Sequence, residues 1–550
     1  MIRVFTICAL VAFPAIRVSS QTLNCVIDFH RNERDPQPWV EFMSESEVIM
    51  ATTTLAWDTL THGSSRVYNE LDSIPRYDYY VNMIRLDSNC QFKDRLWFPR
   101  NSQSGPVRSA DGLIFSVGYA SGMSPIEVGG NEFVADSAGY IPNGVNNSLI
   151  CEVDGSLQHL SSVHITSPFS EITDVVRVGD FYYATGSFMD EMKWNGDSIN
   201  TLEIDQYSRG SSFLAKFDLN LNLIWRKYAH NLPFDFSPSN PSDFRNIVFS
   251  LNDLVGLSNG DVAILGVHEH GLEFDGDTII PVEKTSYRID ALAMTISKDG
   301  EVLHSHQFRT RHQGWHFGAT SNGQGTMIHH VQLDQFQFEG TTYPDADYLV
   351  FYDDTLGVKK VLSLIQAVCV TSSEDGAFYW AGTINDSIDF DGTIVDTQGK
   401  TLFMVGKLSD EGKHLWVKTL PTNMRGLAIA SLGKQIAVQA RVYDNLVLTP
   451  GDTLIKRIPG KYAYATLMFE DHHHVGEDEK ENPDERIKVF PNPSTGAFHL
   501  SHEARFEVFD VLSRRVLSGY GKSIDLSKQH SGIYVVIIDS QHVHKVLLDK

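Results

Sequence analysis

The stretch Gly382–Trp416, GTINDSIDFDGTIVDTQGKTLFMVGKLSDEGKHLW, decides the fold of most of this chain, because its pattern recurs between residues 47 and 471. Runs rich in β-branched and aromatic residues alternate here with turn-forming residues, such as Asp-Gly at 391–392 and Asp-Glu-Gly at 410–412. The strand-forming runs are 377–382, 388–390, 401–408 and 414–420. The stretch therefore predicts one unit of four antiparallel strands.

Aligning the rest of the chain on this pattern gives seven units. They run over residues 47–97, 113–160, 181–225, 261–308, 326–365, 382–416 and 435–471. A turn with glycine as its third residue recurs inside them, at Trp194–Asn195–Gly196, Phe274–Asp275–Gly276, Phe338–Glu339–Gly340 and Phe390–Asp391–Gly392, and more weakly at Val128–Gly129–Gly130 and Thr449–Pro450–Gly451. Because Asp-Phe-Asp-Gly at 389–392 recurs in this way, it is read as a turn between strands and not as a site.

Four-stranded units repeated around an axis make a β-propeller, in which each sheet buries its faces against its neighbours. We therefore expect an all-β chain with a seven-bladed β-propeller-like domain over residues 21–470. A linear β-solenoid is the rival, but its repeats are shorter and more regular.

Unit seven stops at Phe469 without the Leu-Trp strand of the other units, and Pro38–Phe42 is such a strand standing alone. This predicts that Pro38–Phe42 completes the last blade.

The apolar strand with its glycine, the Phe-x-Gly hairpin and the strand ending in Asp-Gly and Trp together resemble propeller repeats of secreted bacterial proteins, especially of Bacteroidetes. The resemblance covers residues 39–470.

The first twenty residues have the parts of a secretory signal: Arg3, the apolar run Val4–Ile16, and the small residues Val18 and Ser20 before a cleavage point at Gln21. The mature chain is expected to be exported, without a transmembrane segment.

Residues 471–486, DHHHVGEDEKENPDER, read as an acidic, solvated linker. Its three histidines could bind a metal, but a disordered surface run is the preferred interpretation.

Residues 487–550 are again rich in strand-forming residues and predict about seven short strands in a small antiparallel β-sandwich (Ig-like). Three motifs stand in order there: Val489–Gly496 (VFPNPSTG), Ile524–Ser527 (IDLS) and Gly532–Tyr534 (GIY), followed by a basic last strand. They resemble the C-terminal sorting domain of type IX secretion cargo, with Ser513 in place of a common glycine. The resemblance implies a sorting signal that includes Pro491, Asn492, Pro493, Gly496, Asp510, Gly532, Tyr534 and Lys550. It also implies contact with the type IX secretion machinery, and a protein that is secreted or attached to the outer-membrane surface.

The composition limits the partners. The formal charge of −24 disfavours nucleic acid and anionic membranes, and suits a cationic partner, a calcium-rich exterior or simple solubility.

After loss of Cys8 with the signal, Cys25, Cys90, Cys151 and Cys369 remain without Cys-x-x-Cys spacing, so a zinc site is not expected. Two disulfides in any of three pairings, or unpaired thiols, stay open.

No convincing catalytic constellation appears, and neither His-Glu-x-x-His nor the P-loop occurs in the sequence. His268–Glu269–His270 could form a metal pair or a strand end. The histidines at 312, 316, 329 and 330 could line a pocket, although no carboxylate motif accompanies them. Asp389–Gly392 and Glu273–Asp277 resemble fragments of calcium loops, but they lack the spacing of a full loop of about twelve residues, and a hairpin turn asks for the same residues.

Asp followed by Ser or Thr and an apolar residue recurs at Asp58, Asp72, Asp136, Asp197, Asp277, Asp354, Asp386 and Asp452. The pattern resembles the O-glycosylation sequon of Bacteroidetes, but strand-edge chemistry would also create it.

The sequence thus predicts an exported, monomeric binding or adhesion module for protein or glycan, with no catalytic residue, metal or cofactor assigned and calcium as the one cofactor considered. The alternative is an extracellular hydrolase or lyase with a site in the propeller channel, and a third possibility is a scaffold. Because the units share their turns, specificity is expected where they differ, around residues 61–76, 136–148, 230–245 and 309–323.

Overall fold

The computed structural model describes most of the chain between Thr22 and Asp549. The described ranges are 22–31, 39–44, 46–55, 60–62, 65–67, 79–87, 92–99, 107–109, 112–119, 126–133, 147–167, 169–189, 191–194, 197–200, 211–231, 250–268, 271–280, 290–308, 314–333, 335–338, 341–364, 369–384, 388–390, 393–395, 397, 399–420, 423–443, 446–449, 452–455, 462–471, 489–490, 494–510, 514–538 and 542–549.

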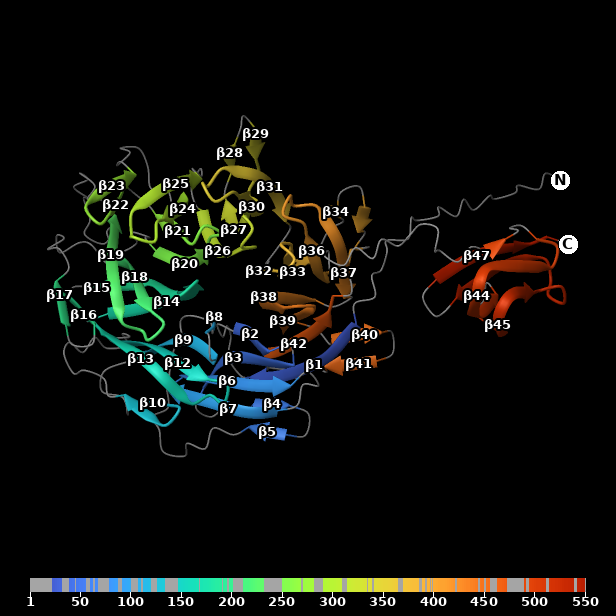
Figure 1. Cartoon of the computed structure of the whole chain (residues 1–550), viewed down its shortest axis with the longest axis horizontal. Helices are drawn as coiled ribbons and strands as arrows, with labels where there is room; N and C mark the ends of the chain where they lie inside the picture. The colour runs from blue at the N-terminus through green and yellow to red at the C-terminus, as the bar shows by residue number, and fades with distance from the viewer. Residues whose placement is uncertain are drawn as a thin grey trace. The chain divides into compact units, whose positions relative to one another are not determined.

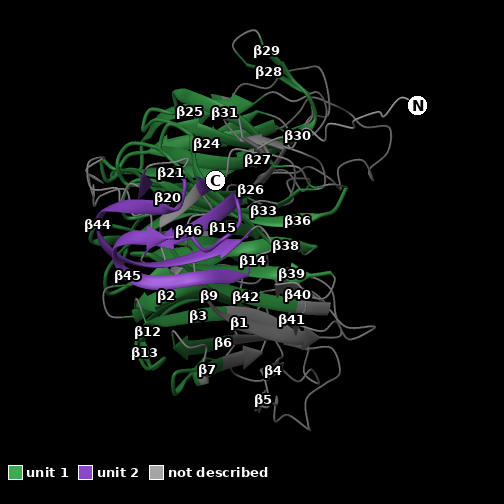
Figure 2. Cartoon of the chain, turned by 90° about the vertical axis from the view of Figure 1, so that its right-hand side faces the viewer, with its two compact units in different colours: residues 1–474 green, residues 475–550 purple. Residues whose placement is uncertain are grey.

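The chain divides into two compact units, which we call unit 1 (residues 1–474) and unit 2 (residues 475–550) (Figure 2). Every regular element in the described ranges is a β-strand, and all ladders that join these strands are antiparallel. The expectation of an all-β chain is confirmed.

The described part of unit 1 builds seven sheets of four or more strands, numbered here in chain order. Sheet 1 contains β2 (Trp39–Ser44), β3 (Glu47–Leu55), β6 (Tyr79–Asp87) and β7 (Phe92–Pro99). Sheet 2 contains β8 (Val107–Arg108), β9 (Gly112–Tyr119), β12 (Asn147–Asp154) and β13 (His159–Thr166). Sheet 3 contains β14 (Phe169–Val178), β15 (Phe181–Met189), β18 (Ser211–Asp218) and β19 (Leu223–Asn231).

The remaining sheets follow the same order of strands. Sheet 4 contains β20 (Ser250–Gly256), β21 (Val262–His268), β24 (Asp290–Ile296) and β25 (Val302–Phe308). Sheet 5 contains β26 (Gly314–Ser321), β27 (Met327–Leu333), β30 (Ala346–Tyr352) and β31 (Val358–Leu364). Sheet 6 contains β32 (Cys369–Ser372), β33 (Phe378–Ile384), β36 (Leu402–Leu408) and β37 (His414–Leu420). Sheet 7 contains β38 (Met424–Leu432), β39 (Gln435–Val442), β42 (Tyr462–Glu470) and β1 (Thr22–Arg31).

Each sheet carries a small hairpin between its second and third strands. The hairpins are β4–β5 (Leu60–His62, Ser65–Val67), β10–β11 (Ile126–Val128, Asn131–Phe133), β16–β17 (Glu191–Trp194, Asp197–Asn200), β22–β23 (Leu272–Phe274, Asp277–Ile280), β28–β29 (Phe336–Phe338, Thr341–Tyr343), β34–β35 (Ile388–Phe390, Thr393–Val395) and β40–β41 (Leu446–Thr449, Asp452–Ile455). Two of them extend the preceding sheet: β16 pairs with β13, and β22 pairs with β19.

The apolar core of unit 1 lies between sheets. Middle strands such as β21 and β24 are buried along their whole length, as expected for strands covered on both faces, whereas the outer strand β25 is largely exposed. Each hydrophobic cluster joins two consecutive sheets. One further cluster joins Val40 and Phe42 of sheet 1 to Ala437 and Met468 of sheet 7. The packing therefore passes from sheet to sheet and returns to the first, and Figure 1 shows the first strands β2, β8, β14, β20, β26, β32 and β38 nearest the centre of this unit.

Two details of the predicted unit were wrong. Ile388–Phe390 is not a strand of sheet 6 but the first half of hairpin β34–β35, and the missing strand is β32, Cys369–Ser372, which precedes the apolar strand. β32 lies near the centre of the unit and is only half-buried. It therefore lacks the apolar run that marks β33 and β36.

The strand predicted to complete the last sheet was also wrong. Pro38–Phe42 falls largely within β2, whose Val40 and Phe42 are buried as the first strand of sheet 1. Sheet 7 is completed instead by β1, which pairs along its length with β42.

Unit 2 contains one five-stranded sheet in its described residues, not a sandwich of about seven short strands. Its strands are β43 (Val489–Phe490), β44 (Ala497–Asp510), β45 (Arg515–Asp525), β46 (Gly532–Ile538) and β47 (His542–Leu548). β44 continues through the polar residues Ser501–Glu503, with an irregular register between His499 and Ala504. One apolar cluster of this sheet includes Phe498, Val508 and Val536.

Candidate functional site

The connections of unit 1 differ in length between the two ends of its sheets. Neighbouring strands are antiparallel, so the connections from first to second and from third to fourth strand lie at one end, which we call the short-turn end. They are brief, for example residues 179–180 and 155–158, and none exceeds the length of 257–261. The opposite end, here the hairpin end, carries the seven described hairpins and the strand ends that longer segments join, such as the end of β19 and the start of β20, which residues 232–249 link. Of the variable segments expected to set specificity, residues 68–76, 136–146, 232–245 and 309–313 lie outside the described ranges.

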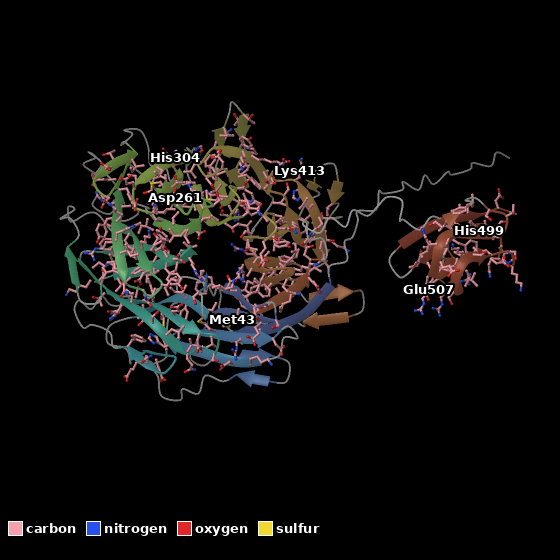
Figure 3. All side chains as sticks on the ribbon, in the orientation of Figure 1. Met43, Asp261, His304, Lys413, His499 and Glu507 are labelled. Carbon is pink, nitrogen blue, oxygen red and sulfur yellow. The ribbon has the colours of Figure 1, made fainter. Side chains whose placement is uncertain are left out.

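Acidic residues at the short-turn end are used to form turns. The Oδ1 atom of Asp154 accepts hydrogen bonds from the N–H groups of Ser156 and Gln158 at 2.7 and 2.9 Å. Asp218 and Asp353 repeat this arrangement in sheets 3 and 5. Burial alone would raise the pKa of Asp353, but hydrogen bonds from Thr355 and Gly357 hold it below its ordinary value. Asp261 and Lys413, labelled in Figure 3, belong to short connections of sheets 4 and 6 at this same end.

The hairpin turns use backbone conformations that few residues adopt. Asp275 and Gly276 have φ values of 52° and 91°, and Gly129 and Gly130 have 53° and 86°. Two successive positive φ values are the signature of the tight turn that matches strand twist. Asp275 forms an ion pair with Lys227, and Glu273 lies 3.5 Å from His230. The second calcium-like fragment is therefore a hairpin turn in which Glu273 and Asp275 have protein partners. Gly196, Gly340 and Gly392 lie outside the described ranges.

The hairpins also account for part of the Asp-Ser/Thr pattern. Asp197, Asp277 and Asp452 each begin the second strand of a hairpin, directly after the turn glycine. Asp354 lies in the turn between β30 and β31. The positions 58, 72, 136 and 386 are outside the described ranges.

The histidines do not gather into one site in the part of the chain that the structure describes. His329 and His330 are both buried in β27, but as neighbours in a strand they point to opposite faces. His268 is buried in β21 opposite Asp290. His312, Glu269 and His270 lie outside the described ranges, as does the side chain of His316. Within those ranges, no three His, Cys, Asp or Glu residues are grouped to hold a metal ion.

Two carboxyl groups near the centre of unit 1 were not singled out from the sequence. Asp174 of β14 accepts hydrogen bonds from the N–H groups of Val175 and Leu254, each at 2.8 Å, and Asp253 of β20 accepts one from Ala319 at 2.7 Å. Burial, and then the neighbouring Asp253, raise the pKa of Asp174 well above its ordinary value. The sequence offers one signal for these two residues, which is the order apolar, polar, Asp, apolar repeated at 172–175 and 251–254. Both strands have an irregular pairing register there.

Cys151 and Cys369 are free thiols, so the four cysteines do not form two disulfides. Burial raises the pKa of Cys369 to about 12, which keeps its thiol protonated. The side chains of Cys25 and Cys90 are outside the description.

In unit 2, segments far apart in the sequence meet around Ser494. Its backbone N–H donates to the carbonyl of Leu547 at 2.9 Å, and its own carbonyl accepts from Asp549 at 2.8 Å. Two residues further on, the carbonyl of Gly496 accepts from Leu526 at 2.7 Å. The turn after β43, the end of β45 and the end of the last strand are thus joined, which is how the first and second predicted motifs and the basic strand come together.

The other predicted sorting residues have structural partners or lie outside the description. Asp510 closes the turn into β45 by pairing with Arg514 at 2.7 Å. The Tyr534 hydroxyl donates to the carbonyl of His530 at 2.8 Å. Gly532 begins β46. Pro491, Asn492, Pro493 and Lys550 are outside the described ranges.

Comparison with known families assigns this unit. Residues 488–547 match the family of secretion system C-terminal sorting domains. The chain carries a type IX sorting domain. A chain with this sorting domain is exported by type IX secretion and is secreted or attached to the outer-membrane surface.

The other comparisons add little about unit 1. No curated protein matches the chain. One solved structure that it resembles is the extracellular domain of a putative hybrid two-component system from B. thetaiotaomicron, with 9% identity, 91% of this chain and 76% of that chain covered, and a TM-score of 0.20. A similarity at this level supports no inference about fold or ligand. Across the described ranges, no helix has the length and apolar character needed to cross a membrane.

Proposed function

We propose that residues 22–471 form a seven-bladed β-propeller that binds a protein or glycan outside the cell, where the sorting domain delivers it. The observation that carries this proposal is the closed series of apolar clusters, in which sheet 7 packs on sheet 1 as every other sheet packs on the next. A propeller needs such closure, because each small sheet is stable only between two neighbours.

The hairpin end is the proposed binding face. The short-turn end is built from tight turns whose polar side chains are engaged in those turns, as at Asp154 and Asp218. The strand ends that long segments join lie at the opposite end, and binding residues are concentrated on loops that a rigid scaffold positions.

We prefer a binding function to a hydrolase or lyase activity because of the hydrogen bonds that the central carboxyl groups accept. Asp174 and Asp253 accept backbone N–H groups of the neighbouring sheets, so they act as links between first strands. A general acid or base instead needs its proton within reach of a substrate.

The proposal is tested by probing immobilised arrays of glycans and extracellular matrix proteins with the mature chain, residues 21–550. The control is a chimera in which residues 232–249, a long connection of the hairpin end, are replaced by a short Gly-Ser linker. Retention of one chemical class by the mature chain and its loss in the folded chimera would support the proposal. Equal retention by both chains would refute the hairpin end as the binding face, and release of cleaved products would refute binding as the function.

A further inference from the structure

A buried lysine meets two carboxyl groups at the joint between sheets 6 and 7. Lys407 of β36 places its Nζ atom 2.6 Å from Oδ2 of Asp375 and 2.9 Å from Oδ2 of Asp471. Asp375 belongs to the turn between β32 and β33, and Asp471 directly follows β42. The side chains of Lys407 and Asp471 are completely buried, and that of Asp375 is 4% exposed.

The surroundings of this cluster are apolar and ordered. Tyr379, Ile436 and Phe469 belong to the apolar cluster that joins the two sheets. The Tyr379 hydroxyl donates to Oδ2 of Asp471 at 2.7 Å, and the Lys407 ammonium group lies 5.0 Å from the centre of the Tyr379 ring. The N–H of Ala377 donates to Oδ1 of Asp375 at 3.2 Å. The amine, the acceptor carboxyl and a second carboxyl are therefore held together without access to water.

Burial makes the charged form of this cluster costly. Removing two ions from water costs several kcal/mol for each ion, roughly, and their attraction repays this only in part. Condensing one carboxylate with the ammonium group would replace two buried charges by a neutral amide. The remaining carboxyl group, Asp375, would lose its ammonium partner but keep its hydrogen bond from Ala377.

We propose that Lys407 and Asp471 condense to an intramolecular isopeptide bond, with Asp375 as the proton-transfer group. Asp375 takes a proton from the Lys407 ammonium, and the free amine attacks Cγ of Asp471, whose Oδ2 atom is hydrogen-bonded by Tyr379. The C–N bond forms as one C–O bond of Asp471 breaks. Two protons of the ammonium leave with that oxygen as one water molecule, Asp375 returns to its carboxylate form, and no oxidant or second substrate is needed.

The charge state of Asp375 suits this role. Burial raises the pKa of its carboxyl, but hydrogen bonds from Lys407, Ser373 and Ala377 and the charge of Lys407 together hold that pKa below its ordinary value. Asp375 is thus a carboxylate at neutral pH, which is the form able to accept the first proton.

The position of Asp471 in the chain gives the isopeptide bond a mechanical role. Asp471 is the last described residue of unit 1, and the chain beyond it leads to the sorting domain. Tension applied through an attached sorting domain would reach sheet 7 at this residue. A covalent bond from Asp471 to β36 would carry that load into sheet 6.

The chain provides a matched internal control. Lys216 of β18 stands at the equivalent position, since it lies opposite Tyr183 as Lys407 lies opposite Tyr379. Its Nζ atom donates to the carbonyl of Lys298 at 2.8 Å and lies 3.9 Å from the centre of the Phe181 ring. A backbone carbonyl cannot condense with an amine in this way, so Lys216 should remain unmodified.

Intact-mass spectrometry of the purified mature chain, followed by peptide mapping, tests the proposal. The expected mass is one water molecule below the value for the sequence, with a branched peptide joining Lys407 to Asp471. Lys407→Arg and Asp375→Asn should restore the full mass, whereas Lys216→Arg should keep the deficit. If the wild-type chain has the full mass and yields an unmodified Lys407 peptide, the cluster is an ion pair and the proposal fails. Because the wild type alone decides, misfolding of a variant does not obscure the result.

Discussion

Thr22 of β1 lies opposite Glu470 of β42, so the first described residue of the chain and the end of the last strand of unit 1 meet in one sheet. The pairing continues to Arg31 opposite Tyr462. Sheet 7 is thus made from both ends of the described part of unit 1.

Deleting residues 22–31 should expose the edge of β42 and produce a chain that aggregates, because an unpaired strand edge recruits other strands. Size-exclusion chromatography and thermal unfolding would measure this. A synthetic peptide of residues 22–31 should restore a monomer by adding the missing strand in trans. A monomeric deletion with unchanged melting would contradict the role given to β1.

Glu41 should make stability fall with rising pH. Burial, opposed by Arg108 3.5 Å away and by the N–H of Phe42, raises the pKa of this carboxyl from 4.5 to about 7. The folded chain then binds more protons than the unfolded chain between these values. The contribution of protonated Glu41 is complete below pH 4.5 and is lost as the pH rises through 7. The free energy of unfolding, measured in urea at several pH values, should fall less with rising pH in Glu41→Gln than in the wild type. An equal fall in both proteins would contradict the role given to Glu41.

Gly276→Ala should destabilise unit 1 by about 1 kcal/mol, because its φ of 91° is strained for a residue with a Cβ, although nothing lies within 4 Å of that atom. Gly155→Ala is the matched control, since its added Cβ would also have room, 3.9 Å from Met43, without a positive φ. Urea unfolding of both variants separates strain from crowding. Equal midpoints would show that the hairpin turn does not require glycine.

Gly496→Leu should reduce export. A Cβ at this position would lie 3.2 Å from Cβ of Ser527, so a larger side chain must displace the segment whose Leu526 N–H binds the Gly496 carbonyl. The fraction of protein outside the cell, compared with the periplasmic fraction, measures the effect. Glu503→Gln on the exposed part of β44 should export normally. Equal export of Gly496→Leu would show that this contact is dispensable for sorting.

The sequence predicted the strands that are buried on both faces and outer strands such as β37, but it missed first strands such as β32 and β14. β33, β36 and β39 carry continuous apolar runs, which mark them without a structure. β32 and β14 are half-buried near the centre, and their polar residues resemble loops. The partner of β42 could not be chosen by pattern, because residues 22–31 and 39–44 both alternate and only the pairing distinguishes them.

The same limit applies to sites. Adjacent histidines such as His329 and His330 suggested a cluster, but strand geometry separates them. Lys407, Asp375 and Asp471 are distant in sequence and meet only through the packing of sheets 6 and 7. The sorting motifs were readable because their residues form a fixed order within one small domain.

The central claim, that unit 1 binds without converting its partner, is tested most directly by recovering a partner captured on the arrays. The mature chain is incubated with that glycan or protein until equilibrium, the complex is isolated, and the mass of the released partner is measured. The account predicts saturable binding and a partner of unchanged mass. Time-dependent loss of the intact partner, with products that scale with protein concentration, would contradict it.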